Sequence, residues 1–291
     1  MKKYLSNLMP CVTALCLLAP YALAQPGAKP GGARVINTVK QKLAEGKQVV
    51  GGTVSSSDPD VYCTMANSGF DFTWIEMQHS PLSYSEVARM IWACRGAQAI
   101  PFVRVPDATE GDIQKATDMG ALGIIIPMVD TLEKAKNGVK FAKYPPIGAR
   151  SQGGGQYGAL WGSDYRQIAN DNIMVVAMVE NPAGVAISEQ LAAIPGIDVV
   201  FVASTDLSSF SGLKQGDPKY EALASKTRDA TLGAGKKVGG PLAWKERQGY
   251  HFFQGPGEGA MIRAGARAVL GGAAPEGGRR GVAPTEGSER K

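Results

Sequence analysis

The chain has 291 residues, of which 44% are hydrophobic and 20% are charged, and its formal net charge is +5. This length suffices for one large core and does not require two domains, because α/β barrels reach this size as single units. The excess of positive charge is mild, and the basic residues do not cluster with interleaved aromatic residues. The composition therefore gives no support to a nucleic-acid-binding function.

The first 24 residues are typical of a secretory signal peptide. Two lysines at positions 2 and 3 precede a short apolar run over 8–19, and small residues follow at positions 22 and 24, where a signal peptidase reads the chain. The run is too short to span a bilayer stably, and a non-cleaved anchor is the alternative. We expect cleavage after Ala24, a periplasmic or secreted protein without further membrane association, and a formal charge lowered by the two lysines from +5 to +3.

The two ends of the remaining chain are rich in glycine, proline and charge. Residues 25–34 and 272–291 cannot bury enough apolar surface to order themselves. We therefore predict a flexible N-terminal segment, a disordered C-terminal tail and one folded domain over residues 35–271.

Short and nearly continuous apolar runs alternate with helical patterns inside this domain. Such runs are typical of parallel strands that are buried on both faces. The predicted strands are 49–54, 70–77, 99–105, 122–128, 173–179, 199–203, 237–242 and 251–254. This order predicts an α/β fold, a (β/α)8 TIM barrel, with a doubly wound sheet as the alternative.

Helix starts are predicted at Ser83, Asp107 and Asp130, because each is followed three residues later by glutamate. Cys63 and Cys94 lie on predicted helices that follow consecutive strands. An oxidising compartment would permit a disulfide between them, and two buried free thiols are the alternative.

One connection, residues 144–162, is unusually long and rich in glycine. Long loops inside compact α/β units are usually functional, and this one follows the fourth strand. We expect it on the face where barrels keep their chemistry, with residues 153–160 selecting substrate size.

Four predicted strands end in polar residues of different chemistry. His79 follows the second strand, Arg104 ends the third, Glu180 ends the fifth and Asp206 lies just beyond the sixth. Each alone has an ordinary explanation as a helix cap or a rim ion pair. The carboxyl ends of barrel strands meet at one mouth, so the set together predicts an active site.

The chemistry of this set points to a metal and a 2-oxo acid. Glu180 and Asp206 with water suit a hard divalent cation such as Mg²⁺ or Mn²⁺, and Co²⁺ is also compatible. The metal would stabilise an enolate, Arg104 would hold the same oxygen, and His79 would move the proton. A Schiff-base mechanism is disfavoured, because the only lysine in a predicted strand, Lys237, opens the seventh strand at the wrong face.

The chain resembles the HpcH/HpaI family of metal-dependent pyruvate aldolases, with barrels of the phosphoenolpyruvate/pyruvate-domain type. The resemblance runs from about residue 49 to about residue 265 and rests on GFDFTWIEMQHSP, PFVRVP, DMGALGIIIPMVDTLEKA, KYPPIGAR, VENPAGV and IDVVFVASTDLS. It implies an aldehyde-lyase that cleaves a 4-hydroxy-2-oxo acid to pyruvate and an aldehyde. It assigns His79 as acid/base, Arg104 as the enolate-stabilising group, and Glu180 with Asp206 as metal ligands.

The resemblance also implies that Asp118 pairs with the catalytic histidine across a subunit interface. The protein would then be a homo-oligomer built from dimers, possibly a hexamer, with exchanged C-terminal helices. Two departures bear on the reaction, the first on proton transfer and the second on the carboxylate pocket. Gln78 stands where the family has glutamate, and Ala203-Ser204-Thr205-Asp206 replaces Gly-Pro-Ser-Asp, whose amides receive the pyruvate carboxylate.

Two other functions remain open at this point. One is a citrate-lyase-β-like or phosphoenolpyruvate-mutase-like enzyme of the same fold. The other is a barrel that binds an oxo acid or a partner with little or no turnover, which the departures at Gln78 and Ala203 motivate. The sequence does not disclose the aldehyde.

Overall fold

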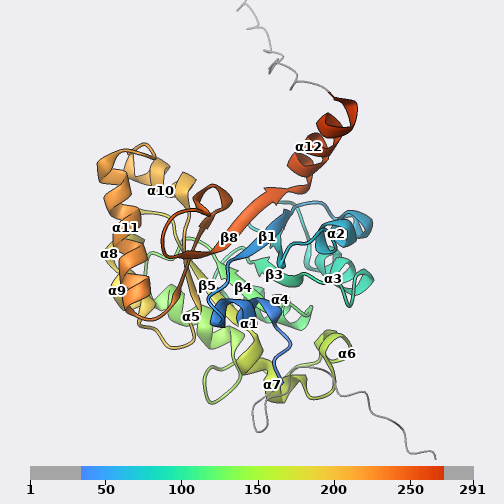
Figure 1. Ribbon diagram of the computed structural model, residues 1–291. Helices are drawn as coiled ribbons and strands as arrows, with labels where there is room; N and C mark the ends of the chain where they lie inside the picture. The colour runs from blue at the N-terminus through green and yellow to red at the C-terminus, as the bar shows by residue number, and fades with distance from the viewer. Residues whose placement is uncertain (1–33, 272–291) are drawn as a thin grey trace, which may run out of the picture.

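A computed structural model describes residues 34–271. Eight parallel strands close into one barrel in chain order, which confirms the predicted (β/α)8 fold (Figure 1). The strands are β1 (Val49–Val54), β2 (Phe72–Glu76), β3 (Ile100–Arg104), β4 (Gly123–Ile126), β5 (Met174–Val179), β6 (Val199–Val202), β7 (Lys237–Pro241) and β8 (Tyr250–Gly257). The predicted signal peptide, most of the predicted N-terminal segment and the predicted tail lie outside the described residues.

Helices surround the barrel, and none in the described range is long and apolar enough to cross a membrane. They are α1 (Thr38–Ala44), α2 (Pro59–Ala66), α3 (Tyr84–Ala93), α4 (Glu110–Asp118), α5 (Leu132–Ala142), α6 (Tyr157–Trp161), α7 (Tyr165–Asn172), α8 (Pro182–Ala186), α9 (Ser188–Ala192), α10 (Ser204–Ser211), α11 (Pro218–Gly233), the 3₁₀ helix η1 (Leu242–Trp244) and α12 (Glu258–Leu270). The last, α12, extends away from the barrel and buries none of its residues (Figure 1).

Aromatic rings fill the inside of the barrel. Phe72 packs against Phe252 with ring centroids 4.5 Å apart and against Phe102 at 4.8 Å. Trp74 packs against Phe201 at 5.2 Å. These rings come from β2, β3, β6 and β8, so they meet across the barrel axis. The interior is therefore a packed aromatic floor beneath the carboxyl ends of the strands, not an open channel.

Glycines on neighbouring strands make room for these rings. A Cβ atom on Gly51 would lie 2.1 Å from Phe72, and one on Gly123 would lie 1.9 Å from Phe102. Both distances are far below a van der Waals contact, so the aromatic floor requires glycine at these two strand positions.

One of the three predicted helix starts is confirmed, and two are wrong. Ser83 forms the predicted capping box of α3. The caps of α4 and α5 are Thr109 and Thr131 rather than Asp107 and Asp130. The Asp107 carboxylate instead accepts a hydrogen bond from the next backbone amide and pairs with a lysine of α5 at 2.6 Å. The hydroxyl groups of Thr109 and Thr131 accept from the first-turn amides of α4 and α5 in place of the predicted carboxylates.

Cys63 and Cys94 form a disulfide, with Cα atoms 5.3 Å apart. Cys63 lies in α2 and Cys94 follows the last residue of α3. Of the two alternatives that the sequence leaves open, the structure has the disulfide. It fastens two neighbouring outer helices to each other.

The long connection over residues 144–162 lies at the opposite end of the barrel from its expected place. It follows α5, which has already returned the chain to the amino-terminal ends of the strands. The Gln156 side chain donates a hydrogen bond of 2.6 Å to the carbonyl of Met119, and Trp161 donates one of 2.9 Å to that of Gly120. Both carbonyls precede β4. The expectation that this loop borders its own chain's mouth is therefore wrong.

Candidate active site

Arg104 lies between two buried carboxylates at the carboxyl ends of the strands. It ends β3, directly beside Glu76 of β2 in the strand register. Its Nη1 lies 3.3 Å from Glu76 Oε2, and its Nη2 lies 3.3 Å from Glu180 Oε1, just past β5. Only 7% of the arginine side chain is exposed. The structure brings Arg104 and Glu180 together at the carboxyl ends of the strands, and Glu76 completes the group.

Glu180 is the most deeply buried carboxylate of the site, with 1% exposure. Its Oε1 accepts a 2.7 Å hydrogen bond from the backbone amide of Met128. Met128 adopts a φ of 51°, in the left-handed region that non-glycine residues rarely occupy. Such strain concentrates at functional sites. Burial raises the pKa of Glu180 to about 7, while Arg104 and the Met128 amide act in the opposite direction.

Asp206 lies in the first turn of α10, directly after β6. Its carboxyl group is close enough to Glu180 to raise the pKa of that residue further. Ala203 is the buried residue before the helix, and no side chain caps the amides that follow it. Thr205 is exposed in the same turn. The predicted metal pair and the predicted amide cradle therefore share one end of the barrel.

His79 lies on the segment that leaves β2, with its side chain exposed. The backbone amides of Gln78 and His79 donate hydrogen bonds of 2.9 and 3.1 Å to Glu76 Oε1. Two buried polar atoms here have no hydrogen-bond partner among residues 34–271: the side-chain oxygen of Gln78 and Nε of Arg104. The mouth thus contains one acceptor and one donor that the protein itself does not use.

The chemistry of this donor set fits a divalent cation. Glu76 and Glu180 flank the Arg104 guanidinium, and the carboxyl group of Asp206 lies beside that of Glu180. Within the described range no group of three or more His, Cys, Asp or Glu side chains is arranged to hold a metal. Two carboxylates would leave most of the coordination sphere to water and substrate, an arrangement that Mg²⁺ favours.

The family model for HpcH/HpaI aldolase/citrate lyase matches residues 53–255. The chain belongs to this family. It is 31% identical over 245 residues to a hydroxypyruvate/pyruvate aldolase of Rhizorhabdus wittichii, which covers 81% of this chain and 98% of that protein. It is 32% identical to a 4-hydroxy-2-oxovalerate aldolase of Novosphingobium aromaticivorans, over 76% of this chain and 85% of that protein.

A solved structure agrees with these relatives. An HpcH/HpaI aldolase/citrate lyase family protein of Burkholderia cenocepacia superimposes with a TM-score of 0.74 and 28% identity, over 81% of this chain and 98% of that one. Family and relatives together identify the chain as a carbon–carbon lyase of the aldolase type.

Asp118 lies at the other end of this aldolase-family barrel. It is the last residue of α4, before the chain enters β4, whereas His79 follows the carboxyl end of β2. Its carboxylate accepts hydrogen bonds of 2.8 Å from Arg150 and 2.9 Å from Gln114, and its side chain is 23% exposed. Asp118 and His79 of one chain are therefore not brought together.

Two residues of the site are absent from the sequence-based set. Glu76 stands beside His79 in the sequence and could have been found, because a carboxylate that ends one strand lies next to an arginine that ends its neighbour. Met128 gives no such indication, since it contributes through its backbone amide. Nothing in its side chain predicts that role.

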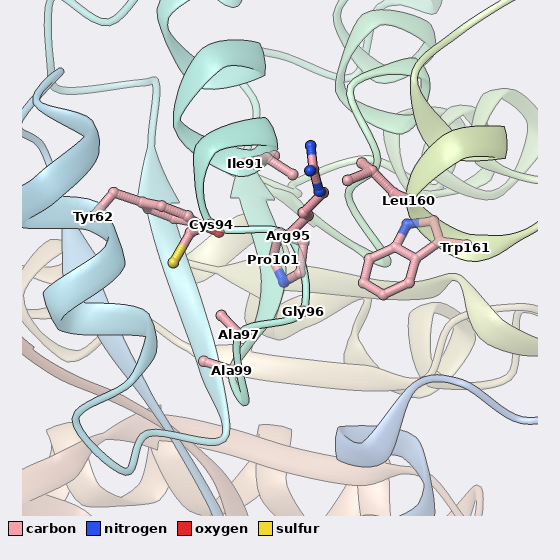
Figure 2. A pocket seen from close by; sticks show the side chains of 10 residues that line it. All are labelled: Tyr62, Ile91, Cys94, Arg95, Gly96, Ala97, Ala99, Pro101, Leu160 and Trp161. Atoms are coloured by element: carbon pink, nitrogen blue, oxygen red, sulfur yellow. The ribbon is translucent and has the colours of Figure 1, made fainter. Parts of the chain in front are cut away.

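A separate hollow lies on the outer wall of the barrel, away from the site. Figure 2 shows it beside the start of β3, bordered by α3 and α6. Its lining includes Arg95 and Cys94 of the disulfide, and it contains none of the mouth carboxylates. We therefore place the active site at the carboxyl ends of the strands.

Proposed function

We propose that this chain cleaves the C3–C4 bond of a 4-hydroxy-2-oxo acid and releases pyruvate, or a close relative of it, together with an aldehyde. The observation that carries the proposal is the position of Arg104, held by Glu76 and Glu180 at the mouth beside Asp206. The two aldolase relatives at 31% and 32% identity support the substrate class.

Each of the chain's own groups has a separate role in this reaction. The Arg104 guanidinium stabilises the negative charge that develops on the 2-oxo oxygen as the bond breaks. His79 transfers the proton between the 4-hydroxyl group, the solvent and the methyl carbon of the product. The free amides after Ala203, including that of Thr205, receive the substrate carboxylate at the start of α10. The unpartnered oxygen of Gln78 accepts a hydrogen bond from a substrate hydroxyl group.

Glu180 and Asp206 would hold a divalent cation, Mg²⁺ or Mn²⁺, with Co²⁺ also compatible with oxygen ligands. When bound, the cation supplies Lewis-acid stabilisation of negative charge on the substrate. The Met128 amide leaves one oxygen of Glu180 partly free, because it binds only Oε1. The fit of the two carboxylates supports metal dependence of this chain.

Deuterium uptake into the methyl group of pyruvate tests this proposal. We expect uptake in Mn²⁺ and none in EDTA, and its loss in His79→Ala and Glu180→Ala. His251→Ala and Glu189→Ala are matched controls, because His251 lies at the opening half of β8 and Glu189 is exposed on α9. Absence of uptake while metal still binds would refute lyase activity and favour a barrel that only binds an oxo acid.

We further propose that the active site is completed by a second copy of the chain. Asp118 lies too far along its own barrel to reach His79 but retains 23% exposure, and α12 has no buried residue in one chain. In a dimer, Asp118 of one copy would face His79 of the other. Packing of α12 against a second barrel would cover its exposed Ile262 and Val269.

Mixing two inactive variants tests this assembly. In a mixed dimer, the His79→Ala copy supplies Asp118 and the Asp118→Ala copy supplies His79, so one of the two sites is intact. Half of randomly mixed dimers are of this mixed kind. About a quarter of the wild-type activity should therefore return. No recovery after co-refolding would mean that Asp118 acts within its own chain or not at all.

Export is likewise a proposal for this chain. Its support is the signal-like pattern of residues 1–24 together with the Cys63–Cys94 disulfide, since disulfides persist in oxidising compartments. N-terminal sequencing of the protein recovered from its native host should begin at Gln25. A mature chain that still begins at Met1 would contradict cleavage.

A further inference from the structure

We propose that Glu76 is a positioning residue that fixes the acid/base segment and the active-site arginine relative to each other. The inference rests on the proposed function, because it takes His79 and Arg104 as the groups that act on the substrate. Glu76 itself need not touch the substrate. Its role follows from how its two oxygens are used.

The two carboxylate oxygens bind different parts of the site. Oε1 accepts the backbone amides of Gln78 at 2.9 Å and His79 at 3.1 Å. Oε2 accepts from Trp74 Nε1 at 3.3 Å and from Arg104 Nη1 at 3.3 Å. Four donors on one carboxylate, which is 6% exposed, leave it little freedom to rotate.

No other described side chain among these contacts joins the two groups. Glu180 holds the other side of the guanidinium, and its further contacts are the Met128 amide and the carboxyl group of Asp206, neither of which reaches the 78–79 segment. The segment that carries His79 is held through Oε1 of Glu76 and through the hydroxyl of Ser80, which donates to the backbone carbonyl of Glu76. The backbones are joined by the bond from the Met77 amide to the Arg104 carbonyl at 3.0 Å. Loss of the Glu76 carboxylate would therefore release the 78–79 amides and the Arg104 guanidinium from their common anchor.

The negative charge of Glu76 is required at this place. All four of its partners are donors, and one of them is a guanidinium. An amide in the same position would direct an NH₂ group toward donors on one side, which leaves either Arg104 or the 78–79 amides without an acceptor. The volume would be unchanged, so Glu76→Gln separates charge and acceptor capacity from packing.

We expect Glu76→Gln to lower kcat for pyruvate methyl exchange and for aldol cleavage about 100-fold, with KM for pyruvate changed by less than about threefold. Glu76→Asp keeps the charge with a shorter reach and should recover part of kcat. Asp71→Asn is the matched control. Asp71 lies at the other end of the same strand, where it accepts the Val50 amide at 2.7 Å and pairs with a lysine.

Two further readouts distinguish positioning from a general loss of structure. Backbone amide exchange over residues 77–80 should accelerate in Glu76→Gln and stay unchanged in Asp71→Asn. In addition, the partial recovery of kcat in Glu76→Asp should be accompanied by a partial return of slow amide exchange over the same residues. A raised KM with normal kcat, or unchanged amide exchange, would overturn the proposal.

The amide-exchange measurement also separates this inference from the proposed function. If the wild-type protein shows no metal-dependent uptake of deuterium into pyruvate, the proposed function fails. Accelerated exchange over residues 77–80 in Glu76→Gln would still establish that this carboxylate holds the segment.

Discussion

The disulfide between Cys63 and Cys94 predicts a large and measurable contribution to stability. The bond closes a loop with a sequence separation of 31 residues. The loss of chain entropy in the unfolded state is then worth about 3.5 kcal/mol at 25 °C. For a domain of this size, that difference corresponds to a fall in Tm of roughly 10 °C on reduction.

Thermal and urea unfolding with and without a phosphine reductant measure this effect. The double variant Cys63→Ala/Cys94→Ala is the control: it should unfold like the reduced wild type and should not respond to the reductant. Alanine retains the Cβ atoms of these half-buried residues, so little packing is lost. Two free thiols in the unfolded, non-reduced protein, or identical unfolding curves with and without reductant, would refute the reasoning.

Three further predictions concern the barrel and its mouth. In EDTA the buried Glu180, whose pKa is raised from 4.5 to about 7, binds a proton more tightly in the folded state than in the unfolded state. Its contribution to the free energy of unfolding is therefore greatest below pH 4.5 and is lost as the pH rises through 7. Urea titrations of Glu180→Gln should lack this component. Arg104→Lys should lower kcat about 100-fold or more, because one ammonium group cannot replace a guanidinium that bridges Glu76 and Glu180, and steady-state kinetics at saturating metal test this. Gly123→Ala should destabilise the protein by about 3 kcal/mol or prevent soluble expression, because the new Cβ would lie 1.9 Å from Phe102; a normal Tm would contradict the aromatic floor.

The strands could be predicted from sequence because each is buried on both faces. β5, for example, is buried at all six positions and reads as a continuous apolar run. The predicted end of β8, at residue 254, is three residues too early, because residues 255–257 read Gly-Pro-Gly, which is typical of a turn. Its pairing with β1 continues to Gly257 opposite Thr53, and that backbone ladder does not depend on side-chain hydrophobicity.

The candidate site could be predicted as a set but not in its geometry. His79, Arg104, Glu180 and Asp206 were found because parallel strands bring their carboxyl ends together. The expected position of the loop over 144–162 is wrong because α5, which lies between β4 and this loop, carries the chain back to the amino-terminal ends of the strands. The role of Met128 depends on a backbone φ of 51°, and no residue type specifies that conformation.

The charges at the mouth predict the order in which ligands bind. The Arg104 guanidinium lies between the carboxylates of Glu76 and Glu180, and the Asp206 carboxyl group lies beside Glu180. An oxo-acid anion would add a further negative charge in a region where charges interact strongly, because water is largely excluded. Glu180 can accept a proton near neutral pH, but that offsets only one charge. The anion should therefore bind only after a divalent cation has neutralised this excess negative charge. Calorimetric titration of pyruvate into the metal-free protein should show no binding at pH 7.5, whereas titration in Mn²⁺ should. Equal affinity in both conditions would mean that Arg104 and the α10 amides suffice by themselves.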